Sequence, residues 1–326
     1  MKNKKRVLVT GAGGFIGHHL VTYLRKKGYW VRGVDLKLPE YKTTDADEFL
    51  LLDLREKENA LKATKGMDHV YALAADMGGM GFISANHATI LYNNSTINLN
   101  TIESARISKV SRYFYSSSAC IYPEFLQKKT KLSPLKEEDA FPAQPQDAYG
   151  WEKLVSEILA KYYFEEYGME TRIARFHNIF GPFGTWDGGR EKAPAALCRK
   201  IAIANLTGSN KIEIWGDGKQ TRSFCYIDDC LTGIYKLMMS DYRQPLNIGQ
   251  DRMVSINELV DIIAKIAGIK LKKKYIAGPQ GVRGRNSDNS RLRKVLKWEP
   301  KISLEEGLAE TYKWIESQVK LKLVNK

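Results

Sequence analysis

A tyrosine and a lysine four residues apart form the first candidate reaction centre of this sequence. Tyr149 and Lys153 lie in the segment DAYGWEKLVSEILAKYY, where apolar residues recur at the spacing of an amphipathic helix. Residues four apart share one helical face, so the phenol and the ammonium can approach each other. A neighbouring cation favours the phenolate, which can take a hydroxyl proton while hydride leaves the same carbon. In isolation, this spacing occurs by chance in many helices, and it favours a partly exposed aromatic residue beside a solvated lysine.

A glycine-rich turn near the N-terminus predicts a dinucleotide site. The β-rich run 5–10 leads into GAGGFIG (11–17) and then into helical spacing, which gives G-x-x-G-x-x-G in a strand–turn–helix context. Such glycines let the backbone approach a pyrophosphate, whose charge the helix N-terminus meets. Asp35 ends the second expected strand, where it can bind an adenosine ribose and repel a 2′-phosphate, so NAD is favoured over NADP. Asp53, which closes the third expected strand, is placed to meet the adenine.

Short β-rich runs alternate with helical patterns through the first 180 residues. This alternation predicts an α/β fold, a Rossmann-type doubly wound parallel sheet with helices on both faces. The expected strands are 5–10, 29–35, 49–52, 69–74, 112–117 and 171–176, and the clearest helices are 16–26, 95–108 and 150–166. Ser118 then follows the end of an expected strand, where an active-site cleft would open.

The pattern loosens after residue 181 into the glycine- and proline-rich stretch GPFGTWDGGREKAP. We therefore expect two regions in this chain of 326 residues. The first is an NAD-binding Rossmann domain over 1–180, joined again by about 221–250. The second is a smaller substrate-binding region over 181–326.

Composition narrows the classes of function. The formal net charge of +14 is high enough to suggest nucleic-acid binding, but the charge is scattered and no recognition motif accompanies it. We therefore expect small phosphate esters as partners and no nucleic acid. The four cysteines lack a C-x-x-C pair and the five histidines lack metal-ligand spacing, so no metal is expected. No apolar stretch approaches the ~20 residues that span a bilayer. We expect a cytoplasmic protein without a membrane partner.

The order of glycine turn, serine and tyrosine–lysine pair resembles the extended short-chain dehydrogenase/reductase family over nearly the whole chain. Within it, the sequence is similar to nucleotide-sugar epimerases that act on a GDP-linked hexose. The stretches that carry the resemblance are AADMGGMGFI (74–83), SSACIYPEF (117–125), PQDAYGWEKL (145–154), RFHNIFGPFGTWDGGREKAPAALCRK (175–200), WGDGKQTRSF (215–224) and GPQGVRGRNSDN (278–289). The resemblance implies NAD contacts at Gly11, Gly14, Phe15, Ile16, Gly17, Asp35, Asp53, Leu54, Ala74, Tyr149 and Lys153.

The same resemblance implies an isomerase that oxidises C4 of GDP-mannose, exchanges protons at C3 and C5, and reduces the ketone to GDP-L-galactose or GDP-L-gulose. Cys120 and Lys192 would be the two proton carriers, beside Ser118, Tyr149 and Lys153. Arginine suits the diphosphate because its planar fork meets phosphate oxygens bidentately. Chemistry alone allows Arg283 as well as Arg285, and the resemblance selects Arg285. The implied substrate contacts are Gly78, Ser118, Cys120, Asn178, Glu191, Lys192, Lys200, Gln220, Arg222 and Arg285.

Three other functions compete with this expectation. An epimerase-reductase similar to GDP-fucose synthase would carry His in place of Lys192, and a UDP-hexose 4-epimerase would usually carry Thr in place of Cys120. A non-catalytic NAD-dependent binding protein should have lost members of the Ser118, Tyr149, Lys153 and Cys120 set, and all are present. The family also implies a homodimer in which the helices expected at 95–108 and 150–166 pair across subunits.

Overall fold

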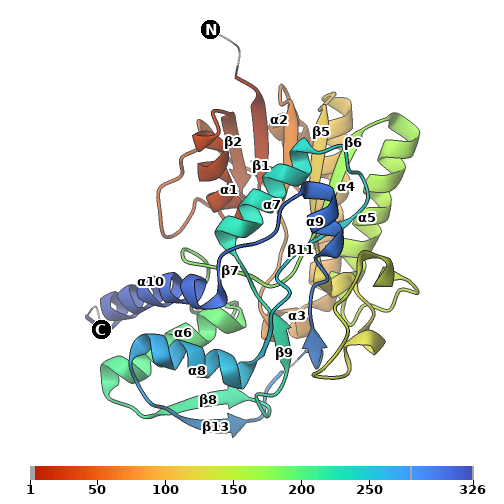
Figure 1. Cartoon of the computed structure of the whole chain (residues 1–326). Helices are drawn as coiled ribbons and strands as arrows, with labels where there is room; N and C mark the ends of the chain where they lie inside the picture. The colour runs from red at the N-terminus through yellow and green to blue at the C-terminus, as the bar shows by residue number, and fades with distance from the viewer. Residues whose placement is uncertain (1–3, 280, 325–326) are drawn as a thin grey trace.

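A computed structural model of the chain describes residues 4–279 and 281–324, and its centre is a seven-stranded parallel sheet (Figure 1). The strand order is β11-β6-β5-β4-β1-β2-β3, and each neighbouring pair runs parallel, as predicted for a doubly wound sheet. The strands are β1 (Arg6–Thr10), β2 (Trp30–Asp35), β3 (Glu48–Leu51), β4 (His69–Ala72), β5 (Arg112–Ser118), β6 (Glu170–Phe176) and β11 (Leu246–Ile248).

Helices cover both faces of this sheet. In β1, Val7 and Val9 pack on one side with Leu20, while Leu8 packs on the other side. Because both faces are covered, the strands read as nearly continuous apolar runs. One face carries α1 (Phe15–Lys26) and α7 (Ile227–Met239), and the other carries α2 (Lys57–Thr64), α4 (His87–Ile107) and α5 (Ala148–Tyr167).

A second region lies at one end of the sheet (Figure 1). Its three long helices pack together, and two of its strands form a separate parallel pair. These are α6 (Ala193–Thr207), α8 (Ile256–Ala267) and α10 (Leu304–Val324), with β8 (Lys211–Trp215) beside β13 (Lys272–Ile276). A three-stranded sheet holds β9 (Thr221–Ser223) between β12 (Met253–Ser255) and β14 (Gly284–Arg285). The remaining elements include α3 (Met80–Ala85), α9 (Ser290–Leu296), β7 (Ile179–Phe180) and β10 (Cys225–Tyr226).

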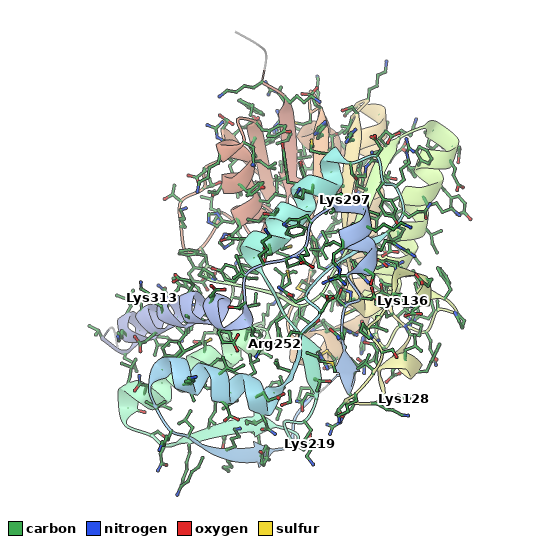
Figure 2. All side chains as sticks on the ribbon, viewed as in Figure 1. Lys128, Lys136, Lys219, Arg252, Lys297 and Lys313 are labelled. Atoms are coloured by element: carbon green, nitrogen blue, oxygen red, sulfur yellow. The ribbon has the colours of Figure 1, made fainter. Side chains whose placement is uncertain are left out.

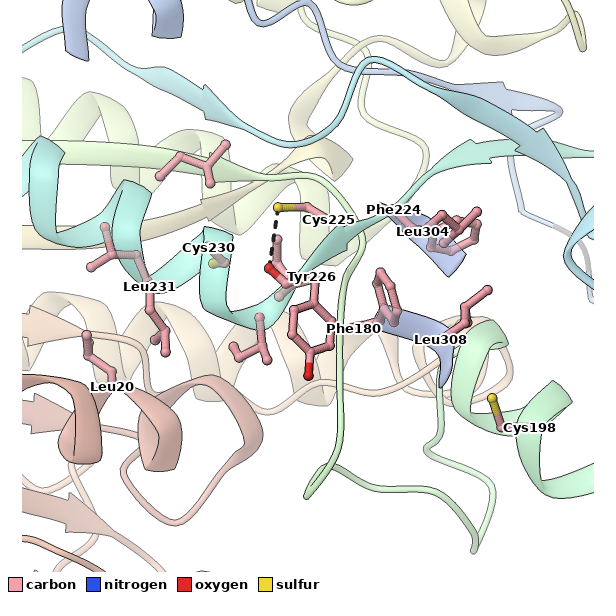
Figure 3. Packing of buried hydrophobic residues seen from close by; sticks show 14 of the residues in the cluster. Leu20, Phe180, Cys198, Phe224, Cys225, Tyr226, Cys230, Leu231, Leu304 and Leu308 are labelled. Carbon is pink, nitrogen blue, oxygen red and sulfur yellow. Dashed lines mark hydrogen bonds between the residues drawn. The ribbon is translucent and has the colours of Figure 1, made fainter. Parts of the chain in front are cut away.

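One apolar cluster joins the two regions. Figure 3 shows Phe180 and Tyr226 beside Leu304 and Leu308 of α10, and the two aromatic rings lie 5.6 Å apart. A Cβ on Gly307 would lie 2.6 Å from an atom of the Tyr226 ring. Helix α10 therefore needs a glycine where it crosses these rings.

The expected strands are all present, with ends within two residues of their expected positions. The helix expected at 95–108 begins earlier, at His87. Its first two turns were missed because their residues are mostly exposed and show no clear apolar period. Strand β11 was not foreseen because only its residues Leu246–Ile248 are extended. Residues 227–248, which form α7 and β11, lie with the first sheet. The division into two domains remains a proposal.

The positive charge is spread over the molecule. In Figure 2, separate loops and helices carry the labelled residues Lys128, Lys136, Lys219, Arg252, Lys297 and Lys313. Some exposed cations are paired, as Arg252 is with Glu305 at 2.7 Å. Within residues 4–279 and 281–324, no helix is long and apolar enough to cross a membrane.

Two leucines of α10 test the cluster that joins the regions. Leu308→Ala should lower the free energy of unfolding by about 2–5 kcal/mol, because Leu308 is fully buried and its truncation leaves a cavity. Leu323→Ala should change it by less than ~0.5 kcal/mol, because Leu323 is 44% exposed. Urea unfolding of both variants measures the difference. Equal losses would contradict this account of the core.

Candidate active site

The glycine turn has the close packing that a dinucleotide site requires. Gly11 has a φ of +70°, and a Cβ there would lie 2.9 Å from the backbone nitrogen of Ala74, which follows β4. A Cβ on Gly17 would lie 2.0 Å from the Gly11 oxygen. The turn therefore sits between β1 and β4, where the strand order reverses and doubly wound sheets bind their ligands. Gly14 begins α1, so the helix N-terminus faces this crevice.

Asp35 lies against the same turn. Its Oδ2 accepts a hydrogen bond from the Gly13 backbone N–H at 2.9 Å, and its Oδ1 accepts one from Leu36 at 2.7 Å. A pocket between the turn and the following loop is lined by Gly14, Phe15 and Lys37, among others. These residues fit the pyrophosphate and ribose of a dinucleotide, because they combine backbone N–H groups, an open pocket and a fixed carboxylate.

The remaining predicted cofactor residues lie near this crevice or support it. Asp53 forms an ion pair with Arg55 at 2.6 Å, and this pair holds the pKa of the Asp53 carboxyl below its usual range. Leu54 is buried in the core on the α2 side of the sheet. The Ala74 backbone N–H donates to the Thr10 Oγ1 at 3.1 Å, which fixes the end of β4 beside β1. Phe15 and Ile16 pack against the core at the start of α1.

Tyr149 and Lys153 form a buried pair, as the spacing predicted. Tyr149 is in the first turn of α5, which Asp147 caps by accepting a hydrogen bond from the Gly150 N–H at 2.9 Å. The Lys153 Nζ lies 5.5 Å from the centre of the Tyr149 ring and 4.9 Å from that of Tyr115. Burial raises the pKa of Tyr149 well above its ordinary value and lowers that of Lys153.

A carboxylate that sequence reasoning missed supports this pair. The Glu152 Oε1 lies 3.8 Å from the Lys153 Nζ, and both side chains are almost completely buried. Asn94 and Asn98 of α4 donate to the two Glu152 oxygens at 2.9 and 3.0 Å. Burial raises the pKa of Glu152, while Lys153 and the two amides act against that rise. Asn94 and Asn98 are four residues apart, but Asn94 precedes the helix expected at 95–108, so their shared face was not predictable.

Cys120 lies where β5 approaches α5. Its backbone N–H donates to the Ser118 Oγ at 3.1 Å, which caps a short 3₁₀ helix, η1 (Ala119–Ile121). A Cβ on Gly150 would lie 2.3 Å from the Cys120 carbonyl oxygen, so the glycine after Tyr149 allows this contact. The Ser118 hydroxyl also acts on Tyr149, where it opposes the rise in pKa that burial causes.

Arg285 contacts the sulfur of Cys120. Its Nη1 donates to the Cys120 Sγ at 3.1 Å, and its Nε donates to the Gln127 Oε1 at 2.6 Å. The sequence predicted Arg285 as a phosphate ligand, and it gave no signal for Gln127, which is 158 residues away in the chain. Arg222 pairs with Arg285 in register between β9 and β14. Burial, with Arg285 beside it, lowers the pKa of Arg222 to about 9.

Lys192 precedes α6 at its N-cap position, and its side chain makes no capping hydrogen bond there. The side chain is exposed at the surface, and desolvation of its ammonium lowers its pKa, an effect that Cys120 opposes. Glu191 does not pair with Lys192. Its carboxylate instead accepts hydrogen bonds at 2.7 Å from Arg199 and from the Gly189 backbone.

The other predicted substrate residues divide into two groups. Asn178 donates from Nδ2 to the Ser223 carbonyl at 2.8 Å, which places it beside β9 and Arg222. Lys200 and Gln220 instead both contact the backbone of β8, through the carbonyls of Glu213 at 2.8 Å and Trp215 at 3.3 Å. Gly78 packs tightly on its own loop, because a Cβ there would lie 3.0 Å from Phe82.

The reactive groups converge on Cys120. Burial dominates the shifted pKa values of Tyr149, Lys153, Lys192 and Arg222, and Cys120 contributes further to each of the four. The site therefore combines a phenol–ammonium pair, a thiol, a second ammonium and arginines beside a dinucleotide crevice. Within the described residues, no group of three His, Cys, Asp or Glu side chains could hold a metal ion. This set suits reversible hydride transfer and proton exchange at a sugar ring.

The fold and the site are those of a nicotinamide-dependent, sugar-modifying Rossmann protein. The profile of the NAD dependent epimerase/dehydratase family matches residues 7–249, and the chain belongs to this family. It is 54% identical over 316 residues to the GDP-mannose 3,5-epimerase of Arabidopsis thaliana. The aligned region covers 96% of this chain and 83% of that relative.

Two further relatives are more distant. The chain is 29% identical to the GDP-L-fucose synthase of Escherichia coli strain K12, over 96% of this chain and 97% of that one. A UDP-glucuronic acid 4-epimerase variant from Bacillus cereus, solved with a substrate analogue and NAD, superposes with a TM-score of 0.81. That structure is 26% identical and covers 96% of this chain and 99% of its own.

Glu152→Gln tests the electrostatics of the redox pair. Removing this negative charge should lower the pKa of both Tyr149 and Lys153, because Glu152 raises the pKa of each. The pH profile of NADH formation with a nucleotide sugar should therefore move to lower pH as a whole, by about one unit. Nicotinamide absorbance measures it. Glu166→Gln, an exposed change on α5, should leave the profile in place, and an unmoved profile in Glu152→Gln would contradict the pairing.

Proposed function

We propose that the protein is a GDP-mannose 3,5-epimerase, which converts GDP-mannose to GDP-L-galactose and GDP-L-gulose. The observation that carries the proposal is the position of Cys120, which contacts α5 at Gly150, next to Tyr149, and accepts from Arg285 at 3.1 Å. Lys192, at the N-cap of α6, is the second proton carrier that the proposal requires. A redox pair alone would serve many members of the family. Two additional proton carriers are needed only when carbon–hydrogen bonds next to the oxidised carbon are broken and re-formed. The 54% identity to the Arabidopsis thaliana enzyme supports the same substrate.

Tyr149 and Lys153 perform the redox half of the proposed reaction. Tyr149, as the phenolate that a neighbouring Lys153 ammonium favours, takes the proton of the C4 hydroxyl and becomes a neutral phenol. NAD, when bound, supplies the acceptor and later the donor of the C4 hydride. Ser118 binds the C4 oxygen of the sugar. Its hydroxyl also opposes the rise in the pKa of Tyr149 that burial causes. Because the hydride taken from C4 is returned to it, the overall reaction has no net oxidation, and the enzyme is an isomerase.

Cys120 and Lys192 perform the proton exchange. A C4 ketone acidifies the hydrogens on C3 and C5, and inversion requires removal of a proton from one face and its return from the other. Two groups on opposite sides of the ring meet this requirement. Cys120 approaches from the end of β5, and Lys192 approaches from the loop before α6. The lowered pKa of Lys192 makes its ammonium a better proton donor near neutral pH.

The predicted contacts hold the two ends of the substrate. Arg222 and Arg285 are adjacent, and like charges held together favour an anion such as the diphosphate between them. Gly78 and Asn178 lie on the sugar side, and Glu191 supports the loop that carries Lys192. Lys200 and Gln220 lie together at the end of β8, where they serve the nucleotide.

Two neighbouring activities are less well supported. A GDP-fucose synthase is a more distant relative at 29% identity, and Lys192 replaces the His expected there. A UDP-hexose 4-epimerase needs no carbon–proton exchange, so it has no use for Cys120 and Lys192 as proton carriers.

Cys120→Ala separates the two halves of the proposed reaction. In deuterated water with NAD and GDP-mannose, the wild-type protein should place deuterium at C3 and C5, as read by NMR. Cys120→Ala should lose this exchange by about 100-fold or more, because general acid–base groups contribute roughly 10²–10⁴-fold. It should still reduce NAD through Tyr149 and Lys153.

Tyr149→Phe is the matched control for this experiment. It should lose NADH formation and, with it, all exchange, because the C4 ketone is never formed. Turnover by the wild type without label at C3 or C5 would reject the 3,5-epimerase proposal. Exchange that survives in Cys120→Ala would reject the role of this thiol.

We also propose that the protein is a cytoplasmic homodimer. Helices α4 and α5 pack together and share an outer surface with large exposed apolar residues, which single-chain proteins rarely leave uncovered. These residues are Leu91, Tyr92, Leu99, Ile107, Trp151, Val155, Ile158 and Tyr162. The four free cysteines suit a reducing compartment such as the cytoplasm.

Val155→Asp tests the proposed dimer. Val155 is 59% exposed on α5, and a carboxylate there should disrupt an apolar interface and yield monomers in sedimentation velocity. Leu321→Asp is the control, because Leu321 is also 59% exposed but lies on α10. It should remain dimeric. A dimeric Val155→Asp protein would exclude this surface as the interface.

A further inference from the structure

Two loops of the active site are fastened to each other. Arg190, two residues before Lys192, donates from Nη1 to the Asp76 Oδ1 at 3.1 Å. Its guanidinium also lies 3.7 Å from the centre of the Phe82 ring. In the opposite direction, the Gly79 backbone N–H donates to the Arg190 carbonyl at 3.0 Å. We call this set of contacts the Arg190 clasp.

The fit between the two loops is close. A Cβ on Gly79 would lie 2.6 Å from the Glu191 carbonyl oxygen, so the backbones of the two loops are in direct contact. Gly78, which is expected to approach the sugar, is next to this contact, and Lys192 is next to Glu191. The clasp therefore joins one predicted side of the sugar site to the residue that precedes its second proton carrier.

Asp76 is itself anchored to the redox side of the site. Its backbone N–H donates to the Asn94 Oδ1 at 2.6 Å, and its carbonyl accepts from the Asn94 Nδ2 at 3.2 Å. Asn93 donates to the Asp76 Oδ2 at 3.2 Å. Asn94 also donates to Glu152, the partner of Lys153. A continuous series of contacts thus runs from Lys153 to Arg190.

From these contacts we infer that Arg190 is a positioning residue, which sets Lys192 at a fixed place relative to the Tyr149–Lys153 pair by fastening its loop to Asp76. This inference rests on the proposed role of Lys192. The chain after Lys192 is held by α6, and the chain before Lys192 is held by the clasp at Arg190. The proposed hydride transfer uses Tyr149, Lys153 and Ser118, none of which contacts Arg190, so it does not need the clasp.

Positioning and stability can be distinguished here. The Asp76 and Arg190 side chains are 24% and 51% exposed, and ion pairs of such exposure contribute little to folding. A displacement of about 1 Å, in contrast, can cost a catalytic group roughly 100-fold in rate. Loss of the clasp should therefore affect proton exchange much more than the fold.

The test measures both half-reactions in Arg190→Met with NAD and GDP-mannose. Solvent deuterium exchange should fall by about 10- to 100-fold, while single-turnover NADH formation stays within about twofold of wild type. Asp76→Asn should cause a similar loss. The double variant should be no worse than either single variant, because both remove the same contact. Arg190→Lys, which keeps the charge but not the planar stack on Phe82, should fall between wild type and Arg190→Met.

Arg252→Met is the matched control. Arg252 is 53% exposed and forms a carboxylate pair with Glu305 at 2.7 Å, and neither residue is among the predicted site residues. Its loss should leave both half-reactions unchanged. The inference is overturned if Arg190→Met exchanges deuterium at the wild-type rate, or if exchange and NADH formation fall together. Absence of label with the wild-type protein would instead reject the proposed function, and the inference would fall with it.

Discussion

The burial of one charged lysine constrains much of this structure. Lys153 is 1% exposed, and an isolated ammonium at such a place would lose its proton. Glu152 supplies the opposite charge, but a buried carboxylate also needs hydrogen bonds. Asn94 and Asn98 provide them from α4. The burial of the redox pair therefore depends on the packing of α4 against α5. Moving either helix away would leave a buried charge without its partners.

The parallel sheet brings the remaining groups to the same place. The glycine turn follows β1, Ser118 ends β5 and Asn178 follows β6, so all three lie at the carboxyl ends of strands. The second region then supplies Lys192, Arg222 and Arg285 from the opposite side. This division explains how one fold serves many sugar chemistries. In the proposed reaction, the sheet positions the redox pair, and the second region adds Lys192 and the two arginines to it.

The accuracy of the sequence predictions varied with the range of the interactions involved. The glycine turn, Asp35 and the Tyr149–Lys153 pair were predictable because each depends on residues within one turn or helix. The start of α4 at His87 was misplaced, since its first turns are exposed and carry no apolar period. The role of Glu152 was missed, because an acidic residue beside an exposed lysine and one beside a buried lysine look identical in a sequence.

The sequence by itself determined the fold class and the cofactor turn, because apolar periodicity and glycine spacing are local properties of the chain. Only the tertiary structure decided which groups contact the reactive atoms. Arg285 reaches Cys120 across 165 residues, and Arg190 reaches Asp76 across 114. Glu191, which the resemblance implied as a substrate contact, pairs with Arg199. Such pairings follow from the packing of distant segments, for which no local spacing carries information.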